Sequence, residues 1–285
     1  MAMIKPLITR RRLLRTALGA GAGAGAMLGY AMGIEPHWFE ITGRDMVVAG
    51  LPEWWHGRTL VHMSDLHLGP RVADDYLLQV FAAVDAMAAD MVIYTGDFVD
   101  NEPGILGHAG RLAKAMPLGK VATFGVLGNH DYGKNWGEPD LADSLVNVLQ
   151  TRGISMLRNR NTIVRGLAVA GFDDLWAERC VLADGMAGLT PGAPALALAH
   201  NPDTVDLPGW EGFNGWIFSG HTHGGQCKPP FLPPPLLPVV NRRYVAGEYA
   251  LGGGRTMYIS RGVGHLLRAR FNVRPEIAVF RLVRG

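Results

Sequence analysis

The sequence predicts a layered α/β domain. Short apolar runs of strand length alternate along the chain with longer segments in which apolar residues recur at helical spacing. Strands mixed with crossover helices in this way are typical of sheets that are covered by helices. Apolar residues make up 48% of the 285 residues, which is enough for a large buried core. No internal repeat or linker interrupts residues 45–285, so we expect one folded domain there.

The expected elements follow from local patterns. Strands are expected at residues 46–48, 59–63, 91–95, 121–127, 162–164, 168–170, 195–199, 216–218, 256–260 and 277–282. Helices are expected at residues 73–88, 105–116, 140–150 and 177–187. The first helix has a clear pattern, because Leu77, Phe81 and Val84 recur on one helical face.

Residues 1–35 form a separate segment. Arg10, Arg11, Arg12 and Arg15 precede a weakly apolar stretch, residues 17–32, that is almost entirely alanine and glycine. A basic head followed by such a stretch indicates an export signal, and the paired arginines resemble a twin-arginine signal. A single membrane anchor with a positive flank is the alternative, and cleavage of the segment stays open.

Charge and cysteine content exclude some classes of protein. Five of the 27 basic residues precede residue 36, which leaves 22 basic against 24 acidic side chains in the body. Without a basic stripe, we expect no nucleic-acid partner. The two cysteines, Cys180 and Cys227, are too few for a disulfide scaffold or a thiolate zinc site.

Residues 229–238, the proline-rich segment, read Pro-Pro-Phe-Leu-Pro-Pro-Pro-Leu-Leu-Pro. Proline at this density excludes a helix or a central strand and favours an extended chain. Two interpretations stay open: a stiff surface loop, or an apolar lip beside the active site that meets lipid or a partner.

Polar residues able to bind metal follow five of the expected strands. They are Asp65 and His67, Asp97, Asn129 with His130 and Asp131, His200, and His221 with His223. Loops at the carboxyl ends of strands in α/β sheets converge on one crevice, so we expect these residues to meet there.

The spacing and residue types suit metal coordination. Asp65 and His67, like His221 and His223, are two residues apart, so an extended backbone would point both side chains of each pair the same way. Gly96, Gly128 and Gly220 each precede a candidate ligand, where a chain leaving a strand needs a tight turn. Carboxylate, amide oxygen and imidazole together favour manganese, iron or zinc.

These motifs carry a family resemblance. D-L-H, G-D-F-V-D, G-N-H-D, an isolated histidine and G-H-T-H, in this order from about Thr59 to His223, resemble the calcineurin-like metallophosphoesterases. The resemblance implies a four-layer sandwich of two mixed β-sheets flanked by helices. It also implies two divalent metal ions, one held by Asp65, His67, Asp97 and His223, and the other by Asp97, Asn129, His200 and His221.

The same resemblance implies catalytic roles. Asp97 would bridge the two metals, and metal binding would lower the pKa of water toward about 7 for attack on phosphorus. His130 would contact the phosphate and protonate the leaving oxygen, with Asp131 orienting it. Asp100 is expected to support a ligand or cap its loop rather than to bind metal.

The motif G-H-T-H-G-G-Q and the tail S-R-G-V-G…R-F-N-V-R-P-E-I resemble a narrower bacterial branch of exported or membrane-associated phosphodiesterases. That branch includes enzymes that split UDP-2,3-diacylglucosamine. Arg261 and Arg270 in this tail are candidates to bind a substrate phosphate, with structural ion pairs as the alternative. His265 and Leu266 are variable-looking positions, which leaves the substrate open.

Three functions follow. The leading one is a binuclear-metal-dependent phosphodiesterase or pyrophosphatase. The second is hydrolysis of UDP-2,3-diacylglucosamine or a similar lipid-linked sugar nucleotide at a membrane surface. The third is a non-catalytic metal-binding scaffold of the same fold.

Overall fold

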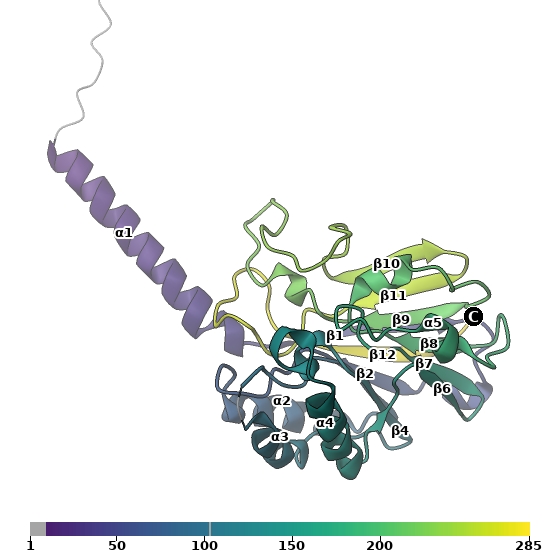
Figure 1. The fold of residues 1–285 in the computed structure, drawn as a ribbon. Coiled ribbons are helices and arrows are strands. Elements are labelled where there is room, and N and C mark those ends of the chain that lie inside the picture. The colour runs from purple at the N-terminus through teal and green to yellow at the C-terminus, as the bar shows by residue number, and fades with distance from the viewer. Residues whose placement is uncertain (1–9, 103) are drawn as a thin grey trace, which may run out of the picture.

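The computed structural model describes residues 10–102 and 104–285 and contains two six-stranded mixed sheets (Figure 1). The first sheet has the strand order β1 (Glu40–Val48), β12 (Glu276–Arg284), β2 (Thr59–Met63), β3 (Met91–Thr95), β4 (Ala122–Val126) and β5 (Ser155–Met156). The second has the order β10 (Gly247–Gly252), β11 (Arg255–Ile259), β9 (Gly215–Ser219), β8 (Ala195–Leu198), β7 (Leu167–Gly171) and β6 (Arg160–Val164). This confirms the predicted two-sheet α/β fold.

Parallel pairing sets the position of the loops that follow the strands. In the first sheet β2, β3, β4 and β5 run parallel, and in the second β7, β8, β9 and β11 run parallel. The carboxyl ends of β2, β3 and β4 therefore lie at one edge of their sheet, as do those of β8 and β9 in theirs. The candidate metal ligands follow these strand ends.

Helices cover the outer face of the first sheet (Figure 1). They are α2 (Asp74–Met87), α3 (Ile105–Ala113) and α4 (Pro139–Arg152). Leu77, Phe81 and Val84 of α2 are buried in one cluster with Val61 and Val92 of the sheet. Burial of each such side chain contributes about 1.5–3 kcal/mol, so this face of α2 holds the helix on the sheet.

A second core fills the space between the two sheets. Leu60 and Ile93 of the first sheet share a buried cluster with Leu196, Phe218 and Tyr258 of the second. Leu60 and Val61 point to opposite faces because side chains alternate along a strand. A smaller core covers the outer face of the second sheet under α5 (Leu182–Met186) and neighbouring loops. Helices, sheet, sheet and this outer cover make the four layers.

Several boundaries differ from the sequence prediction. β1 begins at Glu40, because nine residue pairs join it to β12, although only Met46 and Val48 are buried. The folded body therefore begins before residue 45. The edge strand β10 and the two-residue β5 were missed, because one alternates half-buried with exposed residues and the other is too short for a pattern. The helix expected at residues 177–187 contracts to Leu182–Met186.

Helix α1 (Arg10–Gly33) extends away from the body (Figure 1). Among its described side chains only Ala31 is buried, while Leu18, Met27 and Leu28 are exposed. The helical segment Arg10–His37 contains an 18-residue window with a mean hydropathy of 1.3, so by length and composition it could cross a membrane. Because nearly all of its apolar side chains are exposed, the body does not supply the apolar surroundings that this helix needs.

Candidate metal centre

All seven predicted ligands are buried at one place in the structure. We call the following residues the metal centre: Asp65, His67, Asp97, Asn129, His200, His221 and His223. Each lies in a loop directly after β2, β3, β4, β8 or β9, so the carboxyl ends of strands from both sheets converge there. Charged and polar side chains almost never reach full burial without partners, so this gathering requires a compensating interaction.

The first group of possible ligands is Asp65, His67 and His223. His223 Nε2 lies 3.4 Å from Asp65 Oδ1 and 3.1 Å from His67 Nε2. Their ligand atoms are close enough to surround one small cation.

The second group is Asp97, His200 and His221. Asp97 Oδ2 lies 3.2 Å from His200 Nε2, and His221 Nδ1 lies 3.1 Å from that same nitrogen. Asp97 Oδ2 is also 3.7 Å from His67 Nε2 in the first group. Asp97 therefore stands between the two groups, within reach of both.

Hydrogen bonds on the far side of the histidine rings fix which nitrogens face the centre. His67 Nδ1 lies 3.1 Å from Asp100 Oδ1, and His200 Nδ1 lies 2.6 Å from the carbonyl oxygen of Thr95. Because each Nδ1–H donates outward, each ring in its neutral form would present the lone pair of Nε2 to the centre. His67, Asp100 and His130 form a further possible group, but Asp100 faces the outward nitrogen of His67.

The donor set fits divalent cations. The lone pair of His200 Nε2 faces Asp97 Oδ2, an arrangement that is repulsive unless a proton or a cation lies between them. Asn129 Oδ1 and His221 Nε2 are buried and have no hydrogen-bond partner among residues 10–102 and 104–285. An unpaired buried amide oxygen costs about 1–3 kcal/mol, and coordination to a cation would remove that cost.

The pKa values in the centre follow from burial and from the charged groups that face one another. Burial opposes charge on His200, yet Asp97 raises the pKa of His200 to about 10. Burial opposes charge on Asp97 as well, but His200 and His130 hold the pKa of Asp97 well below its usual value. Burial lowers the pKa of His221 to about 3, so that ring stays neutral, which is the form that binds metal. The centre thus holds the ionised carboxylate of Asp97 beside a protonated His200 and a neutral His221, and a cation that binds there would take the place of the His200 proton.

The backbone of the ligands is unusual. Asp65, His67, Asp97, His221 and His223 all have positive φ, between 48° and 70°. Non-glycine residues rarely adopt this conformation, and they concentrate at functional sites where the surroundings impose it. The expectation of an extended backbone at D-x-H and H-x-H is therefore wrong, and turns rather than strands aim these side chains at one another.

Two glycines permit the close approach of the ligand loops. A Cβ on Gly220 would lie 1.8 Å from Ser64 Oγ and 2.3 Å from Asp65 Oδ2. A Cβ on Gly128 would lie 2.3 Å from Asp97 Oδ1. The sequence prediction assigned these glycines to tight turns, whereas the structure shows that they leave room for the carboxylates.

His130 lies at the edge of the centre, with its ring centroid 5.2 Å from that of His67. Its backbone N–H donates to Asp97 Oδ1 at 3.0 Å, and its Nδ1 has no partner among the described residues. The expectation that Asp131 orients His130 is wrong. Asp131 instead accepts hydrogen bonds from the backbone N–H groups of Val99 and Gly128 and so joins two ligand loops.

Arg261 and Arg270 have internal partners rather than an open substrate surface. Arg270 is fully buried, and its guanidinium donates to the carbonyl oxygens of Arg261, Gly262, Gly264 and Val273. Arg261 pairs with the carboxylates of Glu40 and Glu276. These contacts favour the structural alternative for both arginines, which hold the C-terminal loop, with Arg270 Nη2 3.4 Å from His223 Nδ1.

Other residues at the centre were not singled out from the sequence. The ring of Trp176 packs edge-on against His221 with 4.4 Å between centroids, and Trp136 packs on Trp176. Burial raises the pKa of the nearby Asp174 carboxyl to about 6. Neither Trp136 nor the segment that holds Asp174 and Trp176 shows metal-binding spacing, so only the three-dimensional arrangement reveals these residues.

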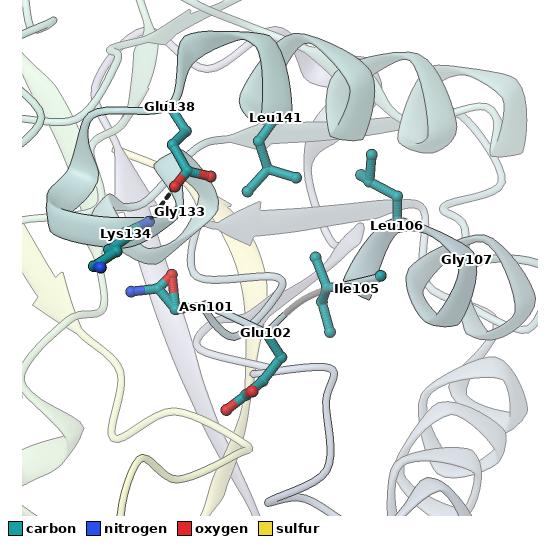
Figure 2. A pocket seen from close by; sticks show the side chains of 10 residues that line it. Asn101, Glu102, Ile105, Leu106, Gly107, Gly133, Lys134, Glu138 and Leu141 are labelled. Carbon is teal, nitrogen blue, oxygen red and sulfur yellow. Dashed lines mark hydrogen bonds between the residues drawn. The ribbon is translucent and has the colours of Figure 1, made fainter.

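A pocket of about 380 Å³ lies beside the centre between residues 101–107 and 133–141 (Figure 2). Asn101 directly follows Asp100, and Gly133 directly follows the loop of His130. Figure 2 shows Asn101, Glu102 and Lys134 on one side of it and Ile105, Leu106 and Leu141 on another. None of its lining residues belongs to the metal centre.

A buried carboxylate standing between two Asp/His groups, with a histidine at the rim, defines a metal-dependent hydrolase of the phosphoester type. The chain matches the calcineurin-like phosphoesterase family over residues 58–225. It therefore belongs to that family, which confirms the recognition made from the motifs.

Three relatives illustrate the range of the family. The phosphodiesterase YaeI of Escherichia coli is 32% identical over 97% of this chain and 100% of its own length. The metallophosphoesterase YkuE of Bacillus subtilis is 30% identical over 96% of this chain and 98% of its own. The UDP-2,3-diacylglucosamine pyrophosphatase LpxG of Chlamydia muridarum is 24% identical over 88% of this chain and 92% of its own.

Proposed function

We propose that this chain hydrolyses a phosphodiester or pyrophosphate bond with two divalent cations. Asp65, His67 and His223 would hold one cation, and Asn129, His200 and His221 the other. Asp97 would bind both. The observation that carries the proposal is the position of Asp97 Oδ2, 3.2 Å from His200 and 3.7 Å from His67. Manganese, iron and zinc all suit this mixed oxygen and nitrogen donor set.

The bound cations would activate water and neutralise charge on the phosphoryl oxygens. The residues of the chain do the rest. The carbonyl of Thr95 and the carboxylate of Asp100 hold His200 and His67 in the tautomer that ligation needs. Asp97 fixes the backbone of His130, so that the imidazole of His130 stands at the rim, where it can donate a proton to the departing oxygen.

Arg261 and Arg270 have structural roles in this proposal. Their guanidinium groups donate to carboxylates and carbonyls of the chain itself, which favours structural roles over phosphate binding. Their contribution is to fix the loop that contacts His223.

A substrate panel tests the proposal. The full chain, loaded separately with Mn²⁺, Fe²⁺ or Zn²⁺, is assayed on an aryl monoester, bis-p-nitrophenyl phosphate and UDP-2,3-diacylglucosamine. We expect metal-dependent cleavage of a diester or pyrophosphate. His130→Ala should lower kcat by about 10²–10⁴ and leave metal content unchanged. The exposed His56→Ala serves as the matched control. Two bound metals with no turnover on any ester would favour the scaffold alternative instead.

The second candidate substrate is a lipid-linked sugar nucleotide such as UDP-2,3-diacylglucosamine. The LpxG relative and the exposed apolar helix α1 support it. Cleavage of bis-p-nitrophenyl phosphate with none of the sugar nucleotide would argue against it. We further propose that residues 1–35 serve as a twin-arginine signal or membrane anchor that places residues 45–285 outside the cytoplasm, because the arginines lie at the far end of α1 from the body.

A further inference from the structure

The proline-rich segment displays large apolar side chains that the body does not cover. Phe231 is 105% exposed, Leu236 72% and Val240 86%, and Leu267 on a neighbouring loop is 66% exposed. No charged residue occurs between Pro229 and Val240. Single exposed apolar residues are ordinary, but a run of them marks a site of interaction. We call Phe231, Leu232, Leu236, Val240 and Leu267 the apolar surface.

Hydrogen bonds fix the base of this surface. Gln226 Nε2 donates to the carbonyl oxygens of Leu267 and Ala269, and Gln226 Oε1 accepts from the backbone N–H of Leu266. The backbone of Val240 is held in turn by the carboxylate of Asp203. These bonds hold the two ends of the proline-rich loop and the backbone around Leu267 in place.

The apolar surface is continuous with the base of α1. The backbone N–H of Arg270 donates to the carbonyl oxygen of Ala31 at 2.8 Å, and that of Val273 donates to Glu35 Oε1 at 2.6 Å. The loop that carries Leu267 is thus bonded directly to the end of the exposed helix. Figure 1 shows the loops at residues 226–240 and 262–275 at the same end of the molecule as the base of α1.

Basic side chains flank the apolar ones. Arg242, Arg243 and Arg268 are exposed, and Arg242 Nη2 donates to the carbonyl oxygen of Pro234. Apolar side chains that enter the acyl region, bordered by arginines at headgroup level, are typical of surfaces that bind anionic bilayers. A soluble protein partner would not require the continuity with α1.

The apolar surface also adjoins the metal centre. Gly225 follows the ligand His223 by two residues, and a Cβ on Gly225 would lie 2.2 Å from Pro234 Cβ. On the other side, Arg270 Nη2 lies 3.4 Å from His223 Nδ1. The same two loops therefore border the ligands and carry the apolar residues.

From these contacts we propose that the apolar surface lies in the interface of an anionic bilayer and presents the metal centre to phosphoesters whose apolar part stays in that bilayer. The docking step stands independently, whereas the substrate class rests on the proposed function. A lipid-linked substrate would then reach the centre without leaving the membrane.

Tryptophan quenching tests the docking step. The full chain is placed in nanodiscs of phosphatidylethanolamine and phosphatidylglycerol with and without brominated acyl chains. Phe231→Trp is compared with Ile163→Trp, which lies on the exposed strand β6. After subtraction of wild-type fluorescence, bromine should quench the tryptophan at 231 by about half and leave the one at 163 nearly unchanged. Equal quenching of both tryptophans, or no quenching of the tryptophan at position 231, would overturn the proposal. A second copy of the chain that covers position 231 would give the latter result.

Activity tests the substrate class. Phe231→Ser, Leu232→Ser and Leu236→Ser are combined, with Leu78→Ser, Ile163→Ser and Val181→Ser as a matched exposed control. We expect the variant with the three substitutions in the proline-rich segment to lose about tenfold in rate on a diacylglycerol p-nitrophenyl phosphodiester in nanodiscs. It should keep its rate on bis-p-nitrophenyl phosphate, and the control variant should keep both rates. Equal loss on both substrates would refute lipid delivery. A wild-type chain inactive on every ester would refute the proposed function, and the quenching result would still decide docking.

Discussion

Asp100→Asn perturbs the metal centre without replacing a proposed ligand. Asp100 Oδ1 lies 3.1 Å from His67 Nδ1, and both side chains are fully buried. The amide keeps the size of the carboxylate and can still accept the Nδ1–H bond, but its negative charge is gone. His67 then becomes a weaker electron donor, and its tautomer is less firmly fixed.

Loss of such a supporting carboxylate typically lowers metal affinity or activity about 10–100-fold. At about 1.36 kcal/mol per tenfold, this corresponds to roughly 1.4–2.7 kcal/mol of metal binding. Because binding of the cation is weakened rather than abolished, excess metal should restore most of the turnover.

The assay is chelator competition on the full chain, with kcat followed as a function of free Mn²⁺. Asp75→Asn, at an exposed position of α2, is the matched control and should behave as wild type. Thermal unfolding of the metal-free forms separates a folding defect from a binding defect. Wild-type metal affinity in Asp100→Asn would refute the assignment of Asp100 as the residue that positions His67.

Three further predictions concern packing and charge. Gly220→Ala should abolish metal binding or cost several kcal/mol of stability, because the new Cβ would lie 1.8 Å from Ser64 Oγ. The control Gly43→Ala should be harmless, since a Cβ at Gly43 has nothing within 4 Å. Chelator competition measures metal binding, and thermal unfolding measures stability. Leu77→Ala should lower the unfolding free energy in urea by about 2–5 kcal/mol, since Leu77 of α2 is fully buried against the first sheet, and a loss below about 1 kcal/mol would refute that packing. Glu276→Gln should cost about 1–3 kcal/mol at pH 7, because Arg261 would lose its buried carboxylate. Burial raises the pKa of Glu276, but the ion pair with Arg261 outweighs burial and lowers that pKa overall. The stability from this pair is therefore complete above the unfolded pKa of about 4.3 and is lost as the pH falls through the lower pKa of the folded state. Wild type should therefore lose its advantage over the variant only in acid, and a constant difference down to pH 2 would contradict this.

The convergence of the candidate ligands was predictable because these residues follow strand ends. Asp97 and His200 each follow a short apolar run directly, and parallel strands bring such positions to one edge of a sheet. Local spacing was a poorer guide. His221 and His223 meet the other ligands through positive φ angles, which no spacing rule for extended chains anticipates.

The arginines of the tail show a second limit of sequence reasoning. Nothing in R-G-V-G or R-F-N-V-R distinguishes an arginine that binds phosphate from one that donates to carbonyl groups of its own loop. Arg270 is used internally because the loop at residues 261–273 wraps around its guanidinium, a long-range arrangement. Edge strand β10 was missed for a related reason, since its exposed face carries no apolar pattern.

The sharing of Asp97 between two cations is the central claim, and electron paramagnetic resonance of the Mn²⁺-loaded full chain tests it most directly. Two manganese ions joined by this carboxylate should give an exchange-coupled spectrum at two equivalents of bound metal, and Asp97→Asn should abolish the coupling. A wild-type chain that saturates at one equivalent, with the six-line signal of an isolated ion, would contradict the account.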